Sequence, residues 1–305
     1  MVGDTMLILG RTLRKKNAIR KSAGSHVFDA FNVIVLSLLA VVTLYPFLRV
    51  LAVSLSSPYA LDAYPMSIIP RNFSISSYLS VLQNDNVTRG FLTSSVITAV
   101  GTVVDVLLTA MLAYPLSKKR LPHRNFFTAV FVATMFFSAG LIPTYLNIKS
   151  LGLINNYLVF ILPRLISTFY LLICRNFFMS ISPEIEESAA VDGANDITIL
   201  FKLIVPISKP ILVTLLLWYG VARWNSYFDC VLYVTDSKKF LLSVVLRNII
   251  MEGTNDRAAG DKTSIYAQEL IRASTIVVSV VPVLLIYPFL QKYFVKGIMI
   301  GSLKG

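Results

Sequence analysis

Charged residues are scarce in this chain of 305 residues. They make up 14% of it, whereas hydrophobic residues make up 55% and the mean hydropathy is +0.70. Because soluble globular domains carry about 25% charged residues, this balance excludes an ordinary soluble domain. The apolar residues also lie in several stretches of roughly 20 residues, the length that crosses the core of a bilayer. The composition therefore predicts an all-α membrane protein.

Cysteine and histidine are almost absent. Cys174 and Cys230 both lie inside apolar stretches, so neither a disulfide framework nor a cysteine metal site is indicated. His26 and His123 flank apolar segments, which is typical of surface residues rather than of ligands or catalytic bases. The Gly-x4-Gly-Lys-Ser/Thr phosphate loop is also missing, because the nearest string, residues 253–262, has the wrong spacing. We therefore predict a non-catalytic chain that holds no metal and no cofactor of its own.

Basic residues exceed acidic ones, which gives a net charge of +12. They form short clusters beside apolar stretches, with no interleaved aromatic platform for bases, so the charge does not indicate nucleic-acid binding. Because basic clusters beside spanning helices mark the cytoplasmic side, both termini are predicted to be cytoplasmic. The basic residues of the predicted outer loop before the last span weigh mildly against this assignment.

Six transmembrane helices result from this assignment. The first is separated from the others by a polar outer loop, and the remaining five form a core with one polar cytoplasmic segment inside it. The predicted parts are a cytoplasmic basic tail at 1–27, a first helix at 28–55, a five-helix core at 91–294 with the cytoplasmic segment 182–210, and a cytoplasmic tail at 295–305. Within the core, the predicted spans are about 91–116, 125–148, 157–179, 211–233 and 271–294.

The cytoplasmic segment 182–210 carries clear helix signals. Ser182 suits the N-cap of a helix and Pro183 suits its first position. Gly193 suits the end of that helix, since glycine adopts a left-handed conformation without steric cost. A second helix is expected over 197–205. We expect Asp196 to cap it and Pro206 to stop it.

A short, self-capped helix pair of this kind can dock as a rigid lever in a groove on a partner protein. From the residues alone, an amphipathic connector that lies on the membrane surface is an equally good interpretation.

The same segment resembles the EAA motif of permease subunits of bacterial ATP-binding-cassette (ABC) importers. That motif reads Glu-Ala-Ala, three residues, then Gly, and here Glu187-Ser188-Ala189 precedes Gly193 with the same spacing. The one departure is Ser188 in place of the first alanine, and its small side chain still fits. By this resemblance, the residues that couple the chain to an ATPase are Glu186, Glu187, Ser188, Ala189, Ala190, Asp192, Gly193, Ala194, Phe201 and Pro206.

The resemblance extends over most of the chain. The strings Tyr114 to Lys119, Gly140 to Tyr145 and Gly297 to Gly305 look like maltose-type second permeases, closest to those for polygalacturonan, aldouronate or similar fragments. It implies a type I ABC importer permease fold in the bacterial inner membrane, and an oligosaccharide as cargo, acidic sugars included. It further implies a pseudo-symmetric heterodimer with a second permease, two ATPase subunits that bind ATP and Mg, and an extracytoplasmic solute-binding protein.

Aromatic and polar side chains on the fourth and fifth spans are candidates for the sugar path. An ionisable group within a span is costly unless it faces a cavity or a partner, so Asp105, Arg164 and Asp229 stand out, and Arg164 can meet an acidic sugar. Other interpretations stay open. Arg164 can pair with Asp105 or with Asp229, or anchor the chain near the membrane interface, and the aromatic residues can pack the bundle or lie at the interface. The candidate path residues are Arg164, Trp218, Tyr219, Trp224, Asn225 and Tyr227.

Other classes of membrane protein fit less well. A membrane enzyme or an autonomous channel needs a catalytic constellation or a symmetric pore motif, and the sequence shows neither. A secondary transporter would show inverted repeats with broken spans at matching positions, and no clear repeat is seen. A secondary transporter and an ABC permease for a non-sugar solute remain the alternatives.

Overall fold

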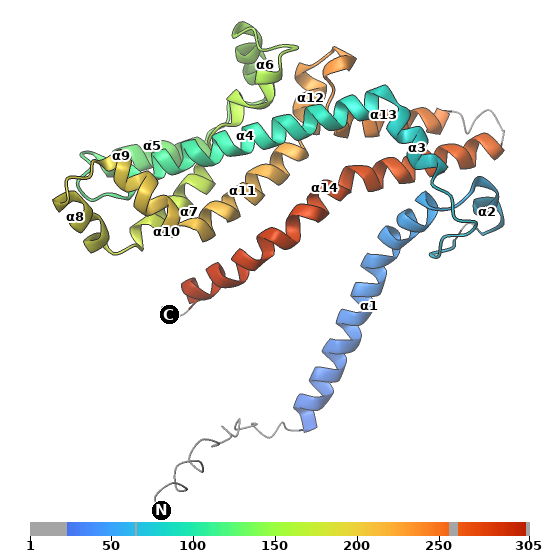
Figure 1. Ribbon diagram of the computed structural model, residues 1–305, viewed down its shortest axis with the longest axis horizontal. Coiled ribbons are helices and arrows are strands. Elements are labelled where there is room, and N and C mark those ends of the chain that lie inside the picture. Colours follow the sequence, from blue (N-terminus) through green and yellow to red (C-terminus); the bar gives the residue numbers. More distant parts are fainter. Residues whose placement is uncertain (1–22, 65, 256–261, 303–305) are drawn as a thin grey trace, which may run out of the picture. The chain divides into compact units, whose positions relative to one another are not determined.

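Every regular element of the computed structural model is a helix within the residues that it describes, which are 23–64, 66–255 and 262–302 (Figure 1). The predicted tail at 1–27 lies almost wholly outside these ranges. The chain divides into two compact units, Met1–Arg49 and Val50–Gly305. All the candidate functional residues lie in the second unit.

Helix α1 (Ala23–Ser54) begins in the first unit and ends in the second, and it overlaps the helix predicted at 28–55. Its stretch Val27–Ser54 is long and apolar enough to cross a membrane. Within the second unit, the Ser54 hydroxyl hydrogen-bonds the Tyr78 hydroxyl at 2.7 Å, and the Ser54 carbonyl accepts from the Ser77 hydroxyl at 3.0 Å. Two short helices follow α1 and complete this end of the unit, α2 (Pro58–Ala63) and α3 (Ser76–Gln83).

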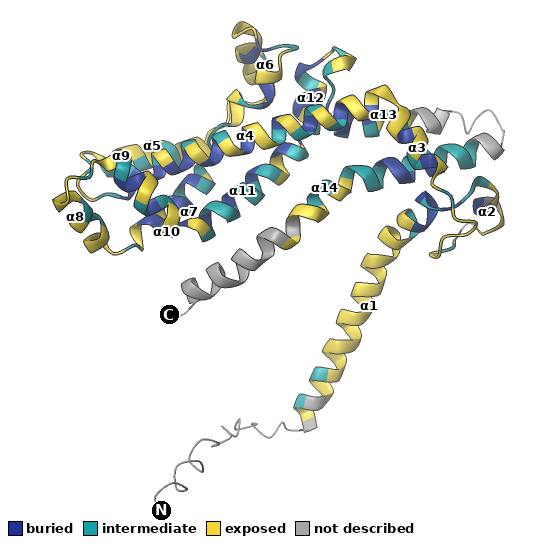
Figure 2. Ribbon diagram, in the orientation of Figure 1, coloured by how far each residue is buried: buried dark blue, intermediate teal, exposed yellow. Residues whose placement is uncertain are grey.

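Helix α4 (Asp85–Ser117) is the long central helix of the second unit. Asn84 caps it, because its side-chain oxygen accepts the N–H groups of Asn86 and Val87 at 3.0 and 3.3 Å. Buried residues recur along α4, as the dark blue parts of its ribbon show in Figure 2, and several of them belong to one apolar core cluster. Two helices pack closely along α4, α7 (Thr168–Met179) and α11 (Lys209–Trp224).

The third and fourth spans are broken. The third consists of α5 (Arg124–Phe136) and α6 (Leu141–Ser150), which are bent by 114°. The bend contains Gly140, whose φ of +83° suits glycine alone without strain. The fourth begins with two 3₁₀ turns, η1 (Tyr157–Phe160) and η2 (Leu162–Arg164), and continues as α7 after a bend of 51°. The spans predicted at 125–148 and 157–179 are thus each a bent pair of helical pieces and not one continuous helix, which hydropathy does not show because a bend leaves the apolar composition unchanged.

The fifth span is broken at both ends. Three short elements, α9 (Asp196–Ile199), the π-helix η3 (Leu200–Ile204) and α10 (Val205–Ile207), lead into α11 through a bend of 84°. Helix α11 ends at Trp224, and α12 (Tyr227–Tyr233) starts after Asn225 and Ser226. The helix predicted over 211–233 is thus interrupted near its outer end.

The predicted outer loop before the last span contains η4 (Ser237–Lys239) and α13 (Leu242–Asn255). The last helix, α14 (Lys262–Ser302), begins before the predicted residue 271 and continues into the predicted tail at 295–305, whose last three residues lie outside the described part. Three described helices are long and apolar enough to cross a membrane, and the number rises to six if each bent pair is one span. The structure therefore accommodates the six predicted spans.

Candidate functional site

Helix α8 (Pro183–Val191) forms the first half of the predicted cytoplasmic segment. Ser182 occupies the N-cap, although its side chain makes no capping hydrogen bond. Gly193 ends the helix with φ +83°, as predicted from its residue type. The closing turn is hydrogen-bonded, because the Gly193 N–H donates to the Ala190 carbonyl at 3.0 Å and the Ala194 N–H donates to the Ala189 carbonyl at 2.9 Å.

The second half of the segment differs from the prediction. Asn195, and not Asp196, is the cap, since its side-chain oxygen accepts the Thr198 N–H at 2.8 Å. The expected helix over 197–205 becomes a π-helix after one turn, and Pro206 lies within α10 instead of ending it. The chain turns only at Ser208, just before α11.

Two ion pairs tie this segment to the loop between α4 and α5. Lys118 pairs with Glu186 in a largely buried contact, and Arg120 pairs with Asp196 at an exposed position. The Lys118 ammonium also lies 4.4 Å from the centre of the Tyr114 ring. Ion pairs at both halves of the segment therefore connect it to the residues that follow α4.

The predicted coupling residues divide into a packed base and an exposed tip. Ala189 and Ala194 pack against the apolar core that α4, α7 and α11 share, and Glu186 is half-buried. At the tip, Val191 is 88% exposed. The coupling residues that are exposed are Glu187, Ser188, Ala190, Asp192, Gly193, Phe201 and Pro206.

A buried ion pair lies deeper in the bundle, between α4 and α11. The Arg223 guanidinium donates to both carboxylate oxygens of Asp105, each at 2.5 Å. Arg223 is 5% exposed and Asp105 is fully buried. Arg223 also donates to the Phe160 carbonyl and, at 3.3 Å, to the Ile161 carbonyl, where η1 passes into η2. One side chain therefore joins α4, α11 and the break in the fourth span.

A second ion pair lies beside the first. The Arg164 guanidinium, at the end of η2, donates to Asp229 of α12 at 2.9 Å, and the Arg164 side chain is 61% exposed. Of the two partners predicted for Arg164, the structure selects Asp229. The partner of Asp105 is Arg223, which the sequence interpretation missed. The rule that singled out Asp105 applies equally to Arg223, because it also lies inside an apolar stretch.

The aromatic candidates occupy different environments. Tyr219 is buried, and its hydroxyl bonds the Thr109 hydroxyl at 2.8 Å and accepts the Ser167 N–H at 3.0 Å, so it serves packing. Trp218 is half-buried and stacks on Tyr170 with ring centres 5.2 Å apart. These contacts agree with the bundle-packing interpretation for both residues.

Two other path candidates flank the break between α11 and α12. Asn225 is exposed, and its side-chain amide donates to the Val221 carbonyl of its own helix at 2.9 Å. Tyr227 is half-buried, and the Arg247 guanidinium lies 5.7 Å from the centre of its ring. Both residues are close in sequence to Asp229, the partner of Arg164.

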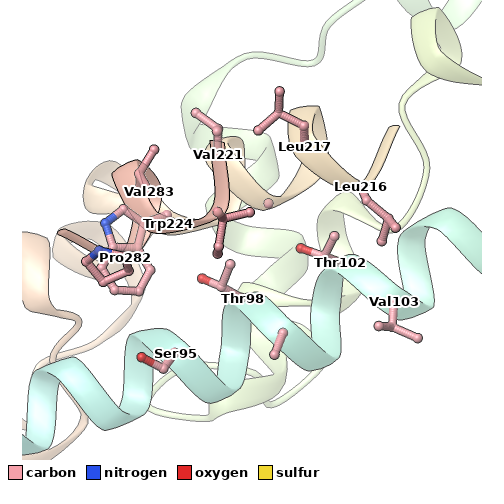
Figure 3. Close-up of a pocket in the computed structure, with 13 residues that line it drawn as sticks. Ser95, Thr98, Thr102, Val103, Leu216, Leu217, Val221, Trp224, Pro282 and Val283 are labelled. Carbon is pink, nitrogen blue, oxygen red and sulfur yellow. The ribbon is translucent and has the colours of Figure 1, made fainter. Parts of the chain in front are cut away.

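A cavity of about 410 Å³ lies between α4, α11 and α14 (Figure 3). Trp224 forms part of its wall, and the indole nitrogen donates to the Ser279 carbonyl at 3.1 Å. The wall is almost wholly apolar apart from hydroxyls such as those of Thr98 and Thr102, which have no hydrogen-bond partner among the described residues. Because ligand sites for polar molecules present several convergent polar groups, this cavity does not have the lining of a sugar site.

The described residues contain no group of three His, Cys, Asp or Glu side chains that could hold a metal ion. Two ion pairs, Arg223 with Asp105 and Arg164 with Asp229, lie at or against breaks in the fourth and fifth spans. Interrupted helices with polar groups at their breaks are typical of substrate pathways in membrane transport proteins. Fold and charges together define a multi-spanning helical transport protein.

Comparison with known proteins places the chain within a family. No protein-family model matches it. It is 37% identical over 291 residues to Protein LplC of Bacillus subtilis (strain 168), which covers 95% of this chain and 99% of that protein. It is 38% identical over 284 residues to the polygalacturonan/rhamnogalacturonan transport system permease protein YtcP of the same organism, covering 92% and 99% of the two chains.

A solved structure agrees with these relatives. The crystal structure of a bacterial ABC transporter involved in the import of the acidic polysaccharide alginate matches with a TM-score of 0.83 and 32% identity, over 90% of this chain and 99% of that one. A crystal structure of a bacterial alginate ABC transporter in complex with an alginate pentasaccharide-bound periplasmic protein shares the fold, with a TM-score of 0.51 and 15% identity. The chain belongs to the permease subunits of bacterial ABC importers for carbohydrates.

Several predictions from the sequence are confirmed by this membership. The chain is an all-helical, multi-spanning inner-membrane protein with the type I ABC importer permease fold. It is a non-catalytic permease subunit for oligosaccharide import and works as part of an ABC transporter complex. A secondary transporter and a permease for a non-sugar solute are thereby set aside.

Proposed function

We propose that this permease carries acidic oligosaccharides, built at least in part from uronic acids, and that Arg164 contacts their carboxylates. The observation that carries the proposal is an exposed guanidinium at facing breaks of two spans, paired with a single carboxylate, Asp229. Two relatives named above transport polygalacturonan or rhamnogalacturonan and alginate, which are acidic polysaccharides.

The geometry of the pair suits an exchange of partners. A guanidinium has five N–H donors. Among the described residues, only Asp229 accepts a hydrogen bond from the Arg164 side chain. A substrate carboxylate can therefore bind the unused donors, or replace Asp229, without leaving Arg164 as an unpaired charge. A neutral sugar gains no such charge-assisted hydrogen bond.

Arg164→Ala should lower the uptake of uronate oligosaccharides far more than that of their methyl esters. A hydrogen bond to a charged group contributes about 1.5–3 kcal/mol, so apparent affinity for the acidic form should fall about tenfold or more. The measurement is uptake into proteoliposomes that hold the complete importer, with trigalacturonate or its methyl ester as the probe.

Lys149→Ala is the matched control, because Lys149 is an exposed cation at the end of α6 and outside the proposed path. It should leave the preference for the acidic form unchanged. An Arg164→Ala importer that keeps the full preference for trigalacturonate over its ester would contradict the proposal.

We further infer the assembly around this chain. A second permease forms a pseudo-symmetric heterodimer with it, two ATPase subunits bind ATP and Mg, and an extracytoplasmic solute-binding protein delivers the sugar. This chain binds no cofactor, and its two termini, with the tails at 1–27 and 295–305, lie in the cytoplasm. The absence of a phosphate loop and the periplasmic protein bound in the alginate transporter complex support this arrangement.

The segment from α8 to α10 is the proposed contact with an ATPase subunit. Its exposed tip, with Val191 and Gly193, is slim enough to enter a groove, and Glu186 and Asp196 tie the segment to the loop that follows α4. Closure of the ATPase dimer would move the segment and, through α4, rock the bundle between inward-open and outward-open states.

Glu186→Lys should uncouple this contact, since it places two cations together where the wild-type side chains are only 15% and 16% exposed. We expect ATP-driven uptake to fall about tenfold, which corresponds to about 1.4 kcal/mol. Adding Lys118→Glu restores opposite charges and should recover most of the activity.

Glu184→Lys is the control for this experiment, because Glu184 lies exposed in the same helical turn and outside the Lys118–Glu186 ion pair. It should have little effect on uptake. If the charge-swapped double variant transports no better than Glu186→Lys alone, the ion pair does not transmit the movement.

A further inference from the structure

The turn that carries Arg164 is held from the side by Arg223. The fourth span is not helical between η1 and η2, so the Phe160 and Ile161 carbonyls there lack the partners that a continuous helix supplies. Arg223 donates to both. The Ile161 carbonyl also accepts the backbone N–H of Arg164 at 3.4 Å. Arg223 and Arg164 thus share one backbone acceptor.

Asp105 determines the orientation of Arg223. It accepts through both carboxylate oxygens, each at 2.5 Å, so the plane of the guanidinium is set by α4 while its remaining donors point at the break. The two ion pairs are therefore connected through the backbone at residue 161.

We infer that Arg223, oriented by Asp105, is a positioning residue that places the Arg164 guanidinium for recognition of an acidic substrate. This inference rests on the proposed function, in which Arg164 contacts the carboxylate. Arg223 itself is buried and does not contact the sugar. Its effect on specificity passes through the turn at residues 160–164.

Gly101 offers a way to displace Arg223 without changing any charge. A Cβ at this position would lie 2.6 Å from the Arg223 Nε and 2.8 Å from its Cζ. The guanidinium cannot move aside freely, because Asp105 and two carbonyls hold it. Gly220, on the facing helix α11, is a matched position with room, since its Cβ would lie 3.7 Å from the nearest atom.

The experiment compares Gly101→Ala, Arg223→Lys and the control Gly220→Ala in the complete importer, with trigalacturonate and its methyl ester as probes. Lysine keeps the charge of Arg223 but cannot bind both Asp105 oxygens and the two carbonyls together. For the acidic probe we expect the first two variants to raise apparent KM about tenfold with kcat changed less than about twofold. For the ester, and for Gly220→Ala, we expect little change.

Each variant is then combined with Arg164→Ala. If Arg223 acts through Arg164, the second change adds no further loss of preference for the acidic probe, whereas independent effects would add. Additive losses, or an unchanged preference in both single variants, overturn the inference. If neither variant accumulates in the membrane, Arg223 is needed for assembly alone, and this outcome also overturns the inference.

The failure of the inference and that of the proposed function are distinguishable. If Arg164→Ala alone leaves the preference unchanged, the proposed function fails. If Arg164→Ala removes the preference while Gly101→Ala and Arg223→Lys keep it, the proposed function stands and only the positioning role fails.

Discussion

Asp105→Ala should remove most of the folded permease from the membrane. The substitution leaves the Arg223 guanidinium buried at 5% exposure without its carboxylate. Removing one partner of a buried ion pair costs about 3–5 kcal/mol, a large part of the roughly 5–15 kcal/mol that stabilises a typical folded domain. The measurement is the yield of monodisperse importer after detergent extraction, together with its thermal unfolding midpoint.

Two further variants sharpen this prediction. Asp85→Ala removes an exposed acid from the first turn of the same helix and should cost less than about 1 kcal/mol. The double variant Asp105→Leu with Arg223→Met removes both charges and should recover much of the yield, because an apolar pair avoids the unpaired buried charge. Wild-type yield and stability in Asp105→Ala would show that the pair does not stabilise the bundle.

Gly193→Val should abolish most ATP-driven uptake while leaving the permease in the membrane. Gly193 has φ +83° and no atom within 4 Å of an added Cβ, so the change strains the backbone and enlarges the exposed tip without clashing inside this chain. A left-handed conformation costs roughly 1–2 kcal/mol for a residue with a Cβ. We expect uptake to fall more than about tenfold.

Gly193→Asn separates the two causes, because asparagine tolerates the left-handed conformation but still adds bulk. A tip that docks in a groove predicts a loss for both variants, whereas pure backbone strain predicts a loss for valine alone. Gly152→Val is the control, since Gly152 has φ +68° and equally open surroundings in the turn after α6. Normal coupling of uptake to ATP hydrolysis in Gly193→Val would contradict the lever role.

The number and approximate position of the spans could be predicted from the sequence, because long apolar stretches require only composition. The breaks within the spans could not be predicted in this way. Residues 125–148 stay apolar across the bend at Gly140, so hydropathy shows no interruption there. The one-residue error at the second coupling helix has a similar cause, since Asn195 and Asp196 are both good caps and only the hydrogen bond to Thr198 distinguishes them.

Part of the charged site could be predicted from the sequence. Arg223 is visible as a charge in an apolar stretch, and the buried residues Ile211, Leu215 and Tyr219 precede it at intervals of four on the same face of α11. That period predicts that Arg223 faces the core, and it also predicts that Tyr219 is buried and does not line the path. The pairing of Arg223 with Asp105 carries no local signal, because it joins residues 118 positions apart.

This separation has a consequence for biosynthesis. Chains are made at about 5–20 residues per second, so Arg223 emerges from the ribosome roughly 6–24 s after Asp105, given the 118 residues between them. During that interval, α4 enters the membrane with an acid whose insertion costs about 2.5–3.5 kcal/mol at mid-depth. Helix α4 is therefore expected to stay near the insertion machinery until α11 arrives. A nascent chain that stalls before residue 223 is the form that quality-control proteases should remove.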